Sequence, residues 1–302
     1  MNIIVIGSIN MDIVMKVPRL PQKGETLMAE DYMTVPGGKG ANQAVAAARL
    51  GSNVTMVGAL GEDAFGDTLL QRLQKENINT TGVRRTSSAS GNALITVDNH
   101  GDNTILVYPG ANHDVSTAWI EEQEKLIVQA DWVMLQLEIP VNSVVTAIET
   151  AQKLGKKVLL NPAPAMTLPE DLYASIDLIT PNETELRILS GKEKIREGAA
   201  WMIEKGVGCV IVTLGAEGSL GMTKDQEVSV PAYPVQPVDS TAAGDAFNAA
   251  VVIALSEGNN LKKSMAFANA AGALTTTVMG AQRSLPSRFE LDQFLKQQVS
   301  DV

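Results

Sequence analysis

The residues with the clearest chemical potential form a run of small side chains that ends in a carboxylate. Ala242, Ala243 and Gly244 directly precede Asp245, and the apolar stretch Ala249–Leu255 predicts that a helix follows. The first N–H groups of a helix lack intrahelical partners, and the helix dipole is positive at that end, so this segment predicts an anion site. A carboxylate beside such a site makes sense if Asp245 takes a proton from a hydroxyl that attacks a phosphate.

Asp245 also has a simpler interpretation, because acidic side chains are favoured in the first turn of any helix. A second motif favours the catalytic interpretation of Asp245. The segment Pro36–Gln43 contains paired glycines followed by Lys39, and it opens an alanine-rich helix over Ala44–Leu50. The glycines let backbone N–H groups approach a ligand, while Lys39 and Asn42 offer polar contacts. The alternative is an ordinary glycine turn before a helix.

Composition narrows the class of protein. The 302 residues, of which 45% are hydrophobic, suit one large α/β domain, or one domain with a small appendage. A net charge of −10 disfavours nucleic acid as a partner. One cysteine, Cys209, allows no disulfide within the chain, and two histidines make a zinc cluster implausible. Without a membrane-spanning apolar run or a signal-peptide pattern, we expect no membrane association and a cytoplasmic location.

From about Trp132 the sequence alternates regularly between strand and helix patterns. Such alternation predicts a mostly parallel central sheet with helices on both faces, and ligands at the carboxyl ends of its strands. The predicted strands are Trp132–Leu137, Lys157–Asn161, Asp177–Thr180 and Gly208–Thr213. The predicted helices are Val141–Leu154, one that starts at Pro181, Glu197–Lys205, Leu261–Leu274 and Arg288–Val299.

The N-terminal part of the chain is less regular. Strand patterns cover Asn2–Gly7, Met11–Val17, Thr26–Val35, Val54–Val57, Ala93–Val97 and Thr104–Val107, and a helix pattern covers Ala64–Glu76. A turn signal at Asn99–Asp102 joins the last two strands. We expect the segments at about 11–35 and 90–110 to form a small separate sheet that acts as a lid over the site. The alternative is that these strands extend the main sheet.

Polar residues gather where the predicted strands end, namely Asn10, Asp12, Glu138, Asn161, Asn182, Glu185 and the loop Thr213–Gly218. The stretch from Thr180 fits a helix start unaided, with Thr180 as cap, Pro181 first and Glu183 completing a capping box. This leaves Asn182 and Glu185 available for a phosphate or for water bound to Mg²⁺. The loop Thr213–Gly218 fits either an ordinary strand end or a glycine-rich nucleotide loop.

Five motifs resemble, in order along the chain, the ribokinase family of sugar kinases. They are Gly7–Asp12, Gly37–Ala44, Asn161–Pro164, Pro181–Glu185 and Asp239–Asp245. Each motif is modest alone, but five in this order are highly specific. The resemblance implies a ribokinase-like α/β kinase domain over residues 1–302, with the small sheet as its lid. In this family two lids commonly pack into a homodimer.

The resemblance also implies roles for individual residues. It implies that the sugar is bound by Asn10, Asp12, Gly38, Lys39, Asn42 and Glu138. Asp245 becomes the catalytic base and Ala242, Ala243 and Gly244 become the anion hole. For ATP it implies Asn182, Thr213, Gly215, Gly218, Gly244 and Asn269, with Glu185 ordering Mg²⁺ through water. It implies that a monovalent cation, K⁺, is surrounded by Asp239, Thr241, Thr275, Val278, Gly280 and Ser284.

The implied activity is transfer of the ATP γ-phosphoryl group to the 5-hydroxyl of D-ribose. Asn10 and Asp12 favour a hydroxyl-rich pentose, because an unpaired buried polar group penalises a substrate that lacks the hydroxyl. The nearest alternative is a kinase for another sugar or nucleoside of the same family, such as deoxyribose or fructose 6-phosphate. A nicotinamide-dependent oxidoreductase is disfavoured because G-x-G-x-x-G does not follow the first strand. The intact Gly244–Asp245 pair disfavours a non-catalytic sugar sensor.

The sequence departs from the wider family at Ala242, where glycine is usual. The anion donors of this segment are backbone N–H groups rather than side chains. We therefore expect alanine to preserve them, unless the position requires a positive φ angle.

Overall fold

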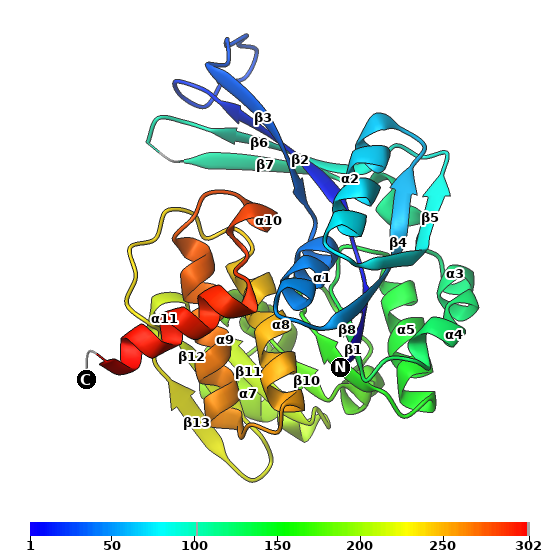
Figure 1. Ribbon diagram of the computed structural model, residues 1–302, viewed down its shortest axis with the longest axis vertical. Coiled ribbons are helices and arrows are strands. Elements are labelled where there is room, and N and C mark those ends of the chain that lie inside the picture. Colours follow the sequence, from blue (N-terminus) through cyan, green and yellow to red (C-terminus); the bar gives the residue numbers. More distant parts are fainter. Residues whose placement is uncertain (101, 301–302) are drawn as a thin grey trace.

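The main body of the protein is a nine-stranded sheet with helices on both faces (Figure 1). The computed structural model describes residues 1–100 and 102–300. From edge to edge, the strands are β13 (Glu227–Val230), β12 (Ser219–Met222), β11 (Cys209–Thr213), β10 (Leu178–Ile179), β9 (Lys157–Leu160), β8 (Trp132–Leu135), β1 (Asn2–Ile6), β4 (Asn53–Gly61) and β5 (Asn79–Thr86). Neighbours from β11 to β5 run parallel, and β12 and β13 add an antiparallel edge. The predicted fold class is confirmed.

The helices divide between two hydrophobic cores because side chains alternate along the strands. On β1, Ile3 and Val5 face one core, whereas Ile4 and Ile6 face the other. The first core is covered by α1 (Lys39–Arg49), α2 (Ala64–Lys75), α8 (Ala243–Ser256), α9 (Leu261–Thr276) and α11 (Arg288–Ser300). The second is covered by α3 (Thr117–Glu122), α4 (Glu124–Ile127), α5 (Val141–Lys153), α6 (Glu183–Ser190) and α7 (Ile195–Glu204).

Short helical turns complete the chain, namely α10 (Ala281–Ser284), η1 (Gly110–Asp114), η2 (Glu170–Ser175) and η3 (Gly215–Glu217). Within the part of the chain that the structure describes, no helix combines the length and apolar character needed to cross a membrane.

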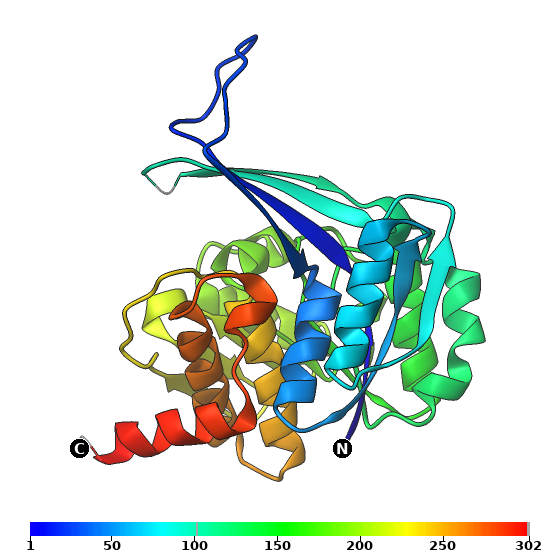
Figure 2. The same cartoon turned by 45° about the horizontal axis from the view of Figure 1, so that its top comes forward.

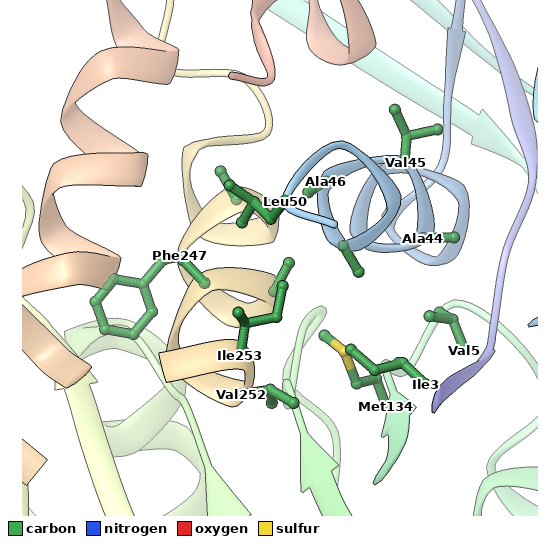
Figure 3. Close-up of a cluster of buried hydrophobic side chains, with 14 of the residues drawn as sticks. Ile3, Val5, Ala44, Val45, Ala46, Leu50, Met134, Phe247, Val252 and Ile253 are labelled. Atoms are coloured by element: carbon green, nitrogen blue, oxygen red, sulfur yellow. The ribbon is translucent and has the colours of Figure 1, made fainter. Parts of the chain in front are cut away.

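The centre of the first core is built from β1, β8, α1 and α8. Figure 3 shows Ile3 and Met134 of the two strands beside Leu50, which caps the end of α1, and Ile253 of α8. Strands buried on both faces are apolar throughout, which explains the unbroken apolar run of β1. Helix α8 is also apolar around most of its circumference, because it packs between α1 and α9. This packing fixes the relative positions of α1 and α8.

A second, four-stranded sheet consists of β3 (Asp31–Gly37), β2 (Asn10–Lys16), β6 (Gly91–Val97) and β7 (Asn103–Tyr108), in that order. It stands away from the nine-stranded sheet and projects beyond the helices (Figure 2). Strand β2 follows β1 after the short connection Gly7–Ile9. The predicted small separate sheet is therefore present, and the alternative in which these strands extend the main sheet is wrong. We call this sheet the lid sheet.

Several predicted bounds shift. The strand predicted over Thr26–Val35 begins only at Asp31, because Asp31 pairs with Lys16, where the partner strand β2 ends. The alanine-rich helix begins at Lys39 and so includes the glycine motif. The sequence patterns do not predict β5, β12 or β13. Gly101, which belongs to the turn predicted between β6 and β7, lies outside the described residues.

Helix α1 approaches the connection between β1 and β2 very closely. A Cβ atom on Gly40 would lie 2.6 Å from the backbone nitrogen of Ser8 and 2.7 Å from the carbonyl carbon of Gly7. The N–H of Ala41 also donates to the carbonyl of Ser8 at 2.9 Å. The missing side chain of Gly40 therefore sets the position of α1, and with it that of Lys39.

Replacing Gly40 should disturb both stability and ligand binding. Gly40→Ala forces a methyl group against fixed backbone, so we expect the free energy of unfolding to fall by about 1–3 kcal/mol and binding of the sugar that the resemblance implies to weaken. Urea denaturation and binding titration measure the two effects. Gly272→Ala in α9 is the stability control, because its added methyl would lie 3.4 Å from the Ala243 carbonyl, an ordinary contact. Equal stability of Gly40→Ala and the parent protein would contradict this account.

Candidate active site

Asp245 lies in the first turn of α8, and only 5% of its surface is exposed. Two amides of α1 donate hydrogen bonds to its carboxylate. Asn42 Nδ2 lies 3.0 Å from Oδ2, and Gln43 Nε2 lies 3.1 Å from Oδ1. Lys39, Asn42 and Gln43 share one face of α1, since they are three and four residues apart. The packing of α1 on α8 thus unites the two motifs that the sequence singles out.

Asp245 opens into a cavity of about 480 Å³, which we call the polar cavity. Its polar lining includes Asn10, Asp12, Gly38, Lys39, Asn42, Glu138, Asn161, Asn182, Glu185 and Thr213. The lid strands β6 and β7 add an apolar wall formed by Ala93, Ile95, Ile105 and Val107. A small ligand rich in hydroxyl groups matches this mixture of hydrogen-bonding groups and apolar surface.

A second cavity, of about 530 Å³, lies beside the first, and we call it the glycine-lined cavity. Its lining includes Thr213, Gly215, Gly218, Tyr233, Phe247, Asn269 and Gly272. The two cavities share Thr213, Ser240 and Gly244. Ligands bound in both would therefore meet at the start of α8.

The chain enters α8 through a left-handed residue. Ala242 is the N-cap and has φ 63° and ψ 5°, a conformation that costs an L-residue about 1–2 kcal/mol. The position thus does require positive φ, which is the condition under which glycine is favoured. Among the described residues, the N–H of Gly244 has no acceptor, whereas the N–H of Ala243 donates to the Ser240 carbonyl at 3.3 Å. In this conformation the predicted three-donor anion hole therefore has the Ala243 donor engaged.

Lys39 provides the positive charge of the polar cavity. Burial alone would lower the pKa of Lys39, but the carboxylates of Asp245, Glu138 and Glu185 outweigh that effect and raise it. Burial also raises the pKa of Asp245, and the charge of Lys39 opposes that shift. The ammonium group thus helps to keep three carboxylates in one cavity.

A fourth carboxyl group of the polar cavity, Asp12, lies within range of the charge of Glu138. Glu138 accepts hydrogen bonds from the Ser8 hydroxyl and, at 3.0 Å, from the N–H of Lys39. Burial, reinforced by the charge of Glu138, raises the pKa of Asp12 to about 7. Asp12 therefore changes charge near neutral pH.

The helix after β10 starts later than predicted. Asn182 is the N-cap of α6, since its side chain accepts from the N–H of Glu185 at 2.8 Å and the Glu185 side chain accepts from the N–H of Asn182 at 2.9 Å. The predicted capping box of Thr180 and Glu183 is wrong. Asn182 and Glu185 still line the polar cavity, but one oxygen of each is engaged in the cap.

The sheet explains this delay. The N–H of Thr180 donates to the Leu160 carbonyl, and Asn182 forms a parallel bridge with Thr213. Extended pairing therefore continues through Pro181, and the helix begins only where that pairing ends.

The residues predicted around a monovalent cation come from two segments, the loop before α8 and the stretch from the end of α9 to α10. Asp239 connects the two segments, because Oδ1 accepts from the N–H of Thr241 at 2.9 Å and Oδ2 accepts from the N–H of Gly280 at 2.8 Å. The other predicted members, Thr275, Val278 and Ser284, lie on α9, on the loop after it and on α10. The hydroxyls of Thr275 and Ser284 donate to carbonyls of their own helices. The oxygens of both hydroxyls keep their lone pairs, so they remain available to an ion together with backbone carbonyls.

Four buried amides support these residues without being predicted, namely Gln43, Asn112, Gln136 and Asn248. Asn112 Nδ2 donates to Asn10 Oδ1 at 2.6 Å, and Asn112 Oδ1 accepts from the N–H of Ile9 at 2.8 Å. Asn248 lines the polar cavity, and its buried Oδ1 finds no hydrogen-bond partner within the described part of the chain. Asn248 follows Asp245 by three residues in a predicted helix, so its spacing could have indicated that both side chains lie on the same face. No local sequence signal connects Asn112 with Asn10.

A buried carboxylate at a helix start, placed where a polar cavity meets a glycine-lined one, suits transfer of a phosphoryl group to a hydroxyl. Residues 1–288 match the pfkB family of carbohydrate kinases. The chain belongs to this family and is a sugar kinase.

Relatives and solved structures agree over almost the whole chain. Ribokinase from Haemophilus influenzae is 42% identical over 298 residues, which cover 97% of each chain. Deoxyribokinase from Salmonella typhimurium is 40% identical over 302 residues, covering 98% of this chain and 99% of that one. The structure of Arabidopsis thaliana ribokinase complexed with ribose and ATP has a TM-score of 0.90 and is 34% identical. The match covers 97% of this chain and 98% of that chain. These similarities confirm the predicted ribokinase-like family and fold.

Asp12 should make stability depend on pH below neutrality. An unfolded chain loses this proton near pH 4, whereas the folded protein keeps it up to about pH 7. Between those values the folded state binds more protons, so the contribution of Asp12 to the free energy of unfolding falls as pH rises. Asp12→Asn should remove that part of the dependence. Urea denaturation of both proteins at about pH 5 and about pH 8 tests this, and an identical pH dependence would refute it.

Proposed function

We propose that this protein transfers the γ-phosphoryl group of ATP to the 5-hydroxyl of D-ribose, giving D-ribose 5-phosphate and ADP. The observation that carries the proposal is the meeting of the two cavities at Gly244, beside the buried carboxylate of Asp245. A sugar in the polar cavity and a nucleotide in the glycine-lined cavity would bring the hydroxyl and the γ-phosphate to one point. The relatives named ribokinase, and the neighbour complexed with ribose and ATP, support the same substrates.

In the proposed reaction, Asp245 accepts the proton of the 5-hydroxyl. The hydroxyl oxygen forms a bond to phosphorus, and the bond from phosphorus to the bridging oxygen of the departing ADP breaks. Backbone donors at the start of α8, Gly244 in particular, stabilise charge on the phosphoryl group. Because the transition state is loose, positioning matters more than a strong base. Closure of the lid sheet would exclude water and limit hydrolysis of ATP.

The proposed sugar contacts are Asn10, Asp12, Gly38, Lys39, Asn42 and Glu138. Deoxyribose is the alternative acceptor, since a deoxyribokinase, at 40% identity, is as similar to this chain as the ribokinases, at 38–42%, are. The polar density of the cavity favours ribose, because binding a sugar without the 2-hydroxyl would leave a buried polar group unpaired.

The proposed ATP contacts are Asn182, Thr213, Gly215, Gly218, Gly244 and Asn269. Within the described residues, no three acidic, histidine or cysteine side chains are grouped to hold a metal ion. This fits a Mg²⁺ that is carried by the nucleotide phosphates and keeps most of its water, which Glu185 would order. When bound, Mg²⁺ neutralises phosphate charge.

We also propose that K⁺ binds the loop held by Asp239. The residues around it would be Asp239, Thr241, Thr275, Val278, Gly280 and Ser284. Carbonyl oxygens are suitable ligands for a hard cation. The loop adjoins the start of α8, so the cation would stabilise the anion site. A cytoplasmic location completes the proposal, and cell fractionation would test it.

Removing the charge of Asp245 should abolish most turnover. Asp245→Asn keeps the shape of the side chain but cannot accept the proton, so we expect kcat to fall by about 10²–10⁴-fold while sugar affinity changes little. Coupled ADP release and calorimetric sugar binding measure the two quantities. Asp225→Asn, on an exposed turn, is the control. Near-normal kcat in Asp245→Asn would exclude this residue as the base.

The substrate itself is tested with a sugar panel. D-ribose, 2-deoxy-D-ribose and fructose 6-phosphate are compared at equal ATP, with and without K⁺. The proposal requires the highest kcat/KM for D-ribose and a clear stimulation by K⁺. A preference for deoxyribose would transfer the assignment to the alternative acceptor, and absence of ATP consumption with every sugar would refute the proposed function.

We further propose that two copies of the chain associate through their lid sheets. Strand β7 is an edge of the lid sheet and is exposed along its whole length. Leu106, 69% exposed, lies on the opposite face from Ile105 and Val107, which line the polar cavity. Soluble proteins seldom leave an apolar edge strand uncovered. A two-fold arrangement would let each lid cover the other.

A charge on this face should prevent the association. Leu106→Asp would bury a carboxylate in the proposed interface, so we expect it to sediment as a single chain where the parent protein sediments as a dimer. Sedimentation velocity at several concentrations measures the state. Val128→Asp, which changes an exposed apolar residue away from the lid sheet, is the control. A monomeric parent protein would contradict the proposal.

A further inference from the structure

Gln43 makes contacts that the reaction described above does not use. It is fully buried and does not line the polar cavity. Its Nε2 donates to Asp245 Oδ1 at 3.1 Å and to Asn161 Oδ1 at 3.2 Å. Its Oε1 accepts from Gln136 Nε2 at 2.6 Å. Both amide hydrogens of Gln43 are therefore engaged by protein groups, so the side chain has no donor left for a substrate.

The Asp245 carboxylate only accepts hydrogen bonds, so the amino end of the Gln43 amide faces it, and Gln136 donates to the other end. Gln136 follows β8, and the alternation of that strand directs it to the same face as Met134, toward α1. Turning the Gln43 amide over would place its oxygen against the Asp245 carboxylate and its amino group against that of Gln136. Gly7 makes room for this arrangement, because a Cβ atom there would lie 1.9 Å from Gln136 Oε1.

We propose that Gln43, held in orientation by Gln136, is a positioning residue for Asp245. It engages Oδ1 from a side that does not open into the polar cavity, while Oδ2, bonded to the cavity residue Asn42, is left to meet the attacking hydroxyl. The inference rests on the proposed function, because it concerns the base of that reaction.

The surrounding charges explain why a neutral donor suits this position. Asp245 faces Lys39 from α1, Glu138 from the end of β8 and Glu185 from α6. Burial raises the pKa of Asp245, and the hydrogen bond from Gln43 acts in the opposite direction. An amide therefore favours the carboxylate form without adding a second cation, which would weaken the base.

The test is the pH dependence of a single turnover, measured by rapid quench with D-ribose. Gln43→Met keeps the volume of the side chain but removes the donor, so the pKa of Asp245 should rise. The acidic limb of the rate profile should move upward by about 1 pH unit, a loss of about tenfold at low pH. The KM for the sugar should change less, since Gln43 does not touch the cavity. Gln136→Leu should move the acidic limb of the rate profile in the same direction, but by less than Gln43→Met does.

A merely structural role for Gln43 would lower the rate equally at every pH. The double variant Gln43→Met with Gln136→Leu guards against poor folding, because replacing both partners of a buried hydrogen bond restores a matched apolar contact. It should recover thermal stability relative to Gln43→Met while keeping the shifted limb. A folded Gln43→Met or double variant whose limb coincides with that of the parent protein would overturn the inference. If the parent protein phosphorylates no sugar, the proposed function fails instead.

Discussion

A carboxylate buried in a protein interior must be compensated by hydrogen-bond donors or by charge, since an isolated ion there is strongly unfavourable. Asp245 is in this position, and its compensation comes almost entirely from another element, α1, through two amide donors and the ammonium group of Lys39. The chemistry attributed to α8 therefore depends on the placement of α1. This single requirement connects the core, the glycine motif and the two cavities.

The fold meets the requirement through close packing. Alanines of α1 and α8 let the two helices approach each other above the central strands (Figure 3), and the absence of a side chain at Gly40 lets α1 lie directly on the backbone that leads into β2. Strand β2 then carries Asn10 and Asp12 into the same cavity. One end of the main sheet thus gathers groups from widely separated parts of the sequence, and the lid sheet forms the remaining wall.

Much of this could be predicted from the sequence because the signals are local. Regular strand and helix alternation predicts the parallel sheet, and short motifs predict most of the polar lining. The start of α6 could not be decided locally, since Thr180 and Asn182 both begin acceptable capping boxes and sheet pairing selects the second. The hydrogen bond between Gln136 and Gln43 joins residues 93 positions apart. The left-handed conformation of Ala242 likewise depends on how the Asp239 loop enters α8.

The most direct test of the central claim is a crystal structure with D-ribose and a non-hydrolysable ATP analogue bound together. The account predicts the 5-hydroxyl within about 3 Å of the Asp245 carboxylate, with the γ-phosphate at the N–H of Gly244. A sugar whose 5-hydroxyl points away from Asp245, or a γ-phosphate remote from the start of α8, would contradict it.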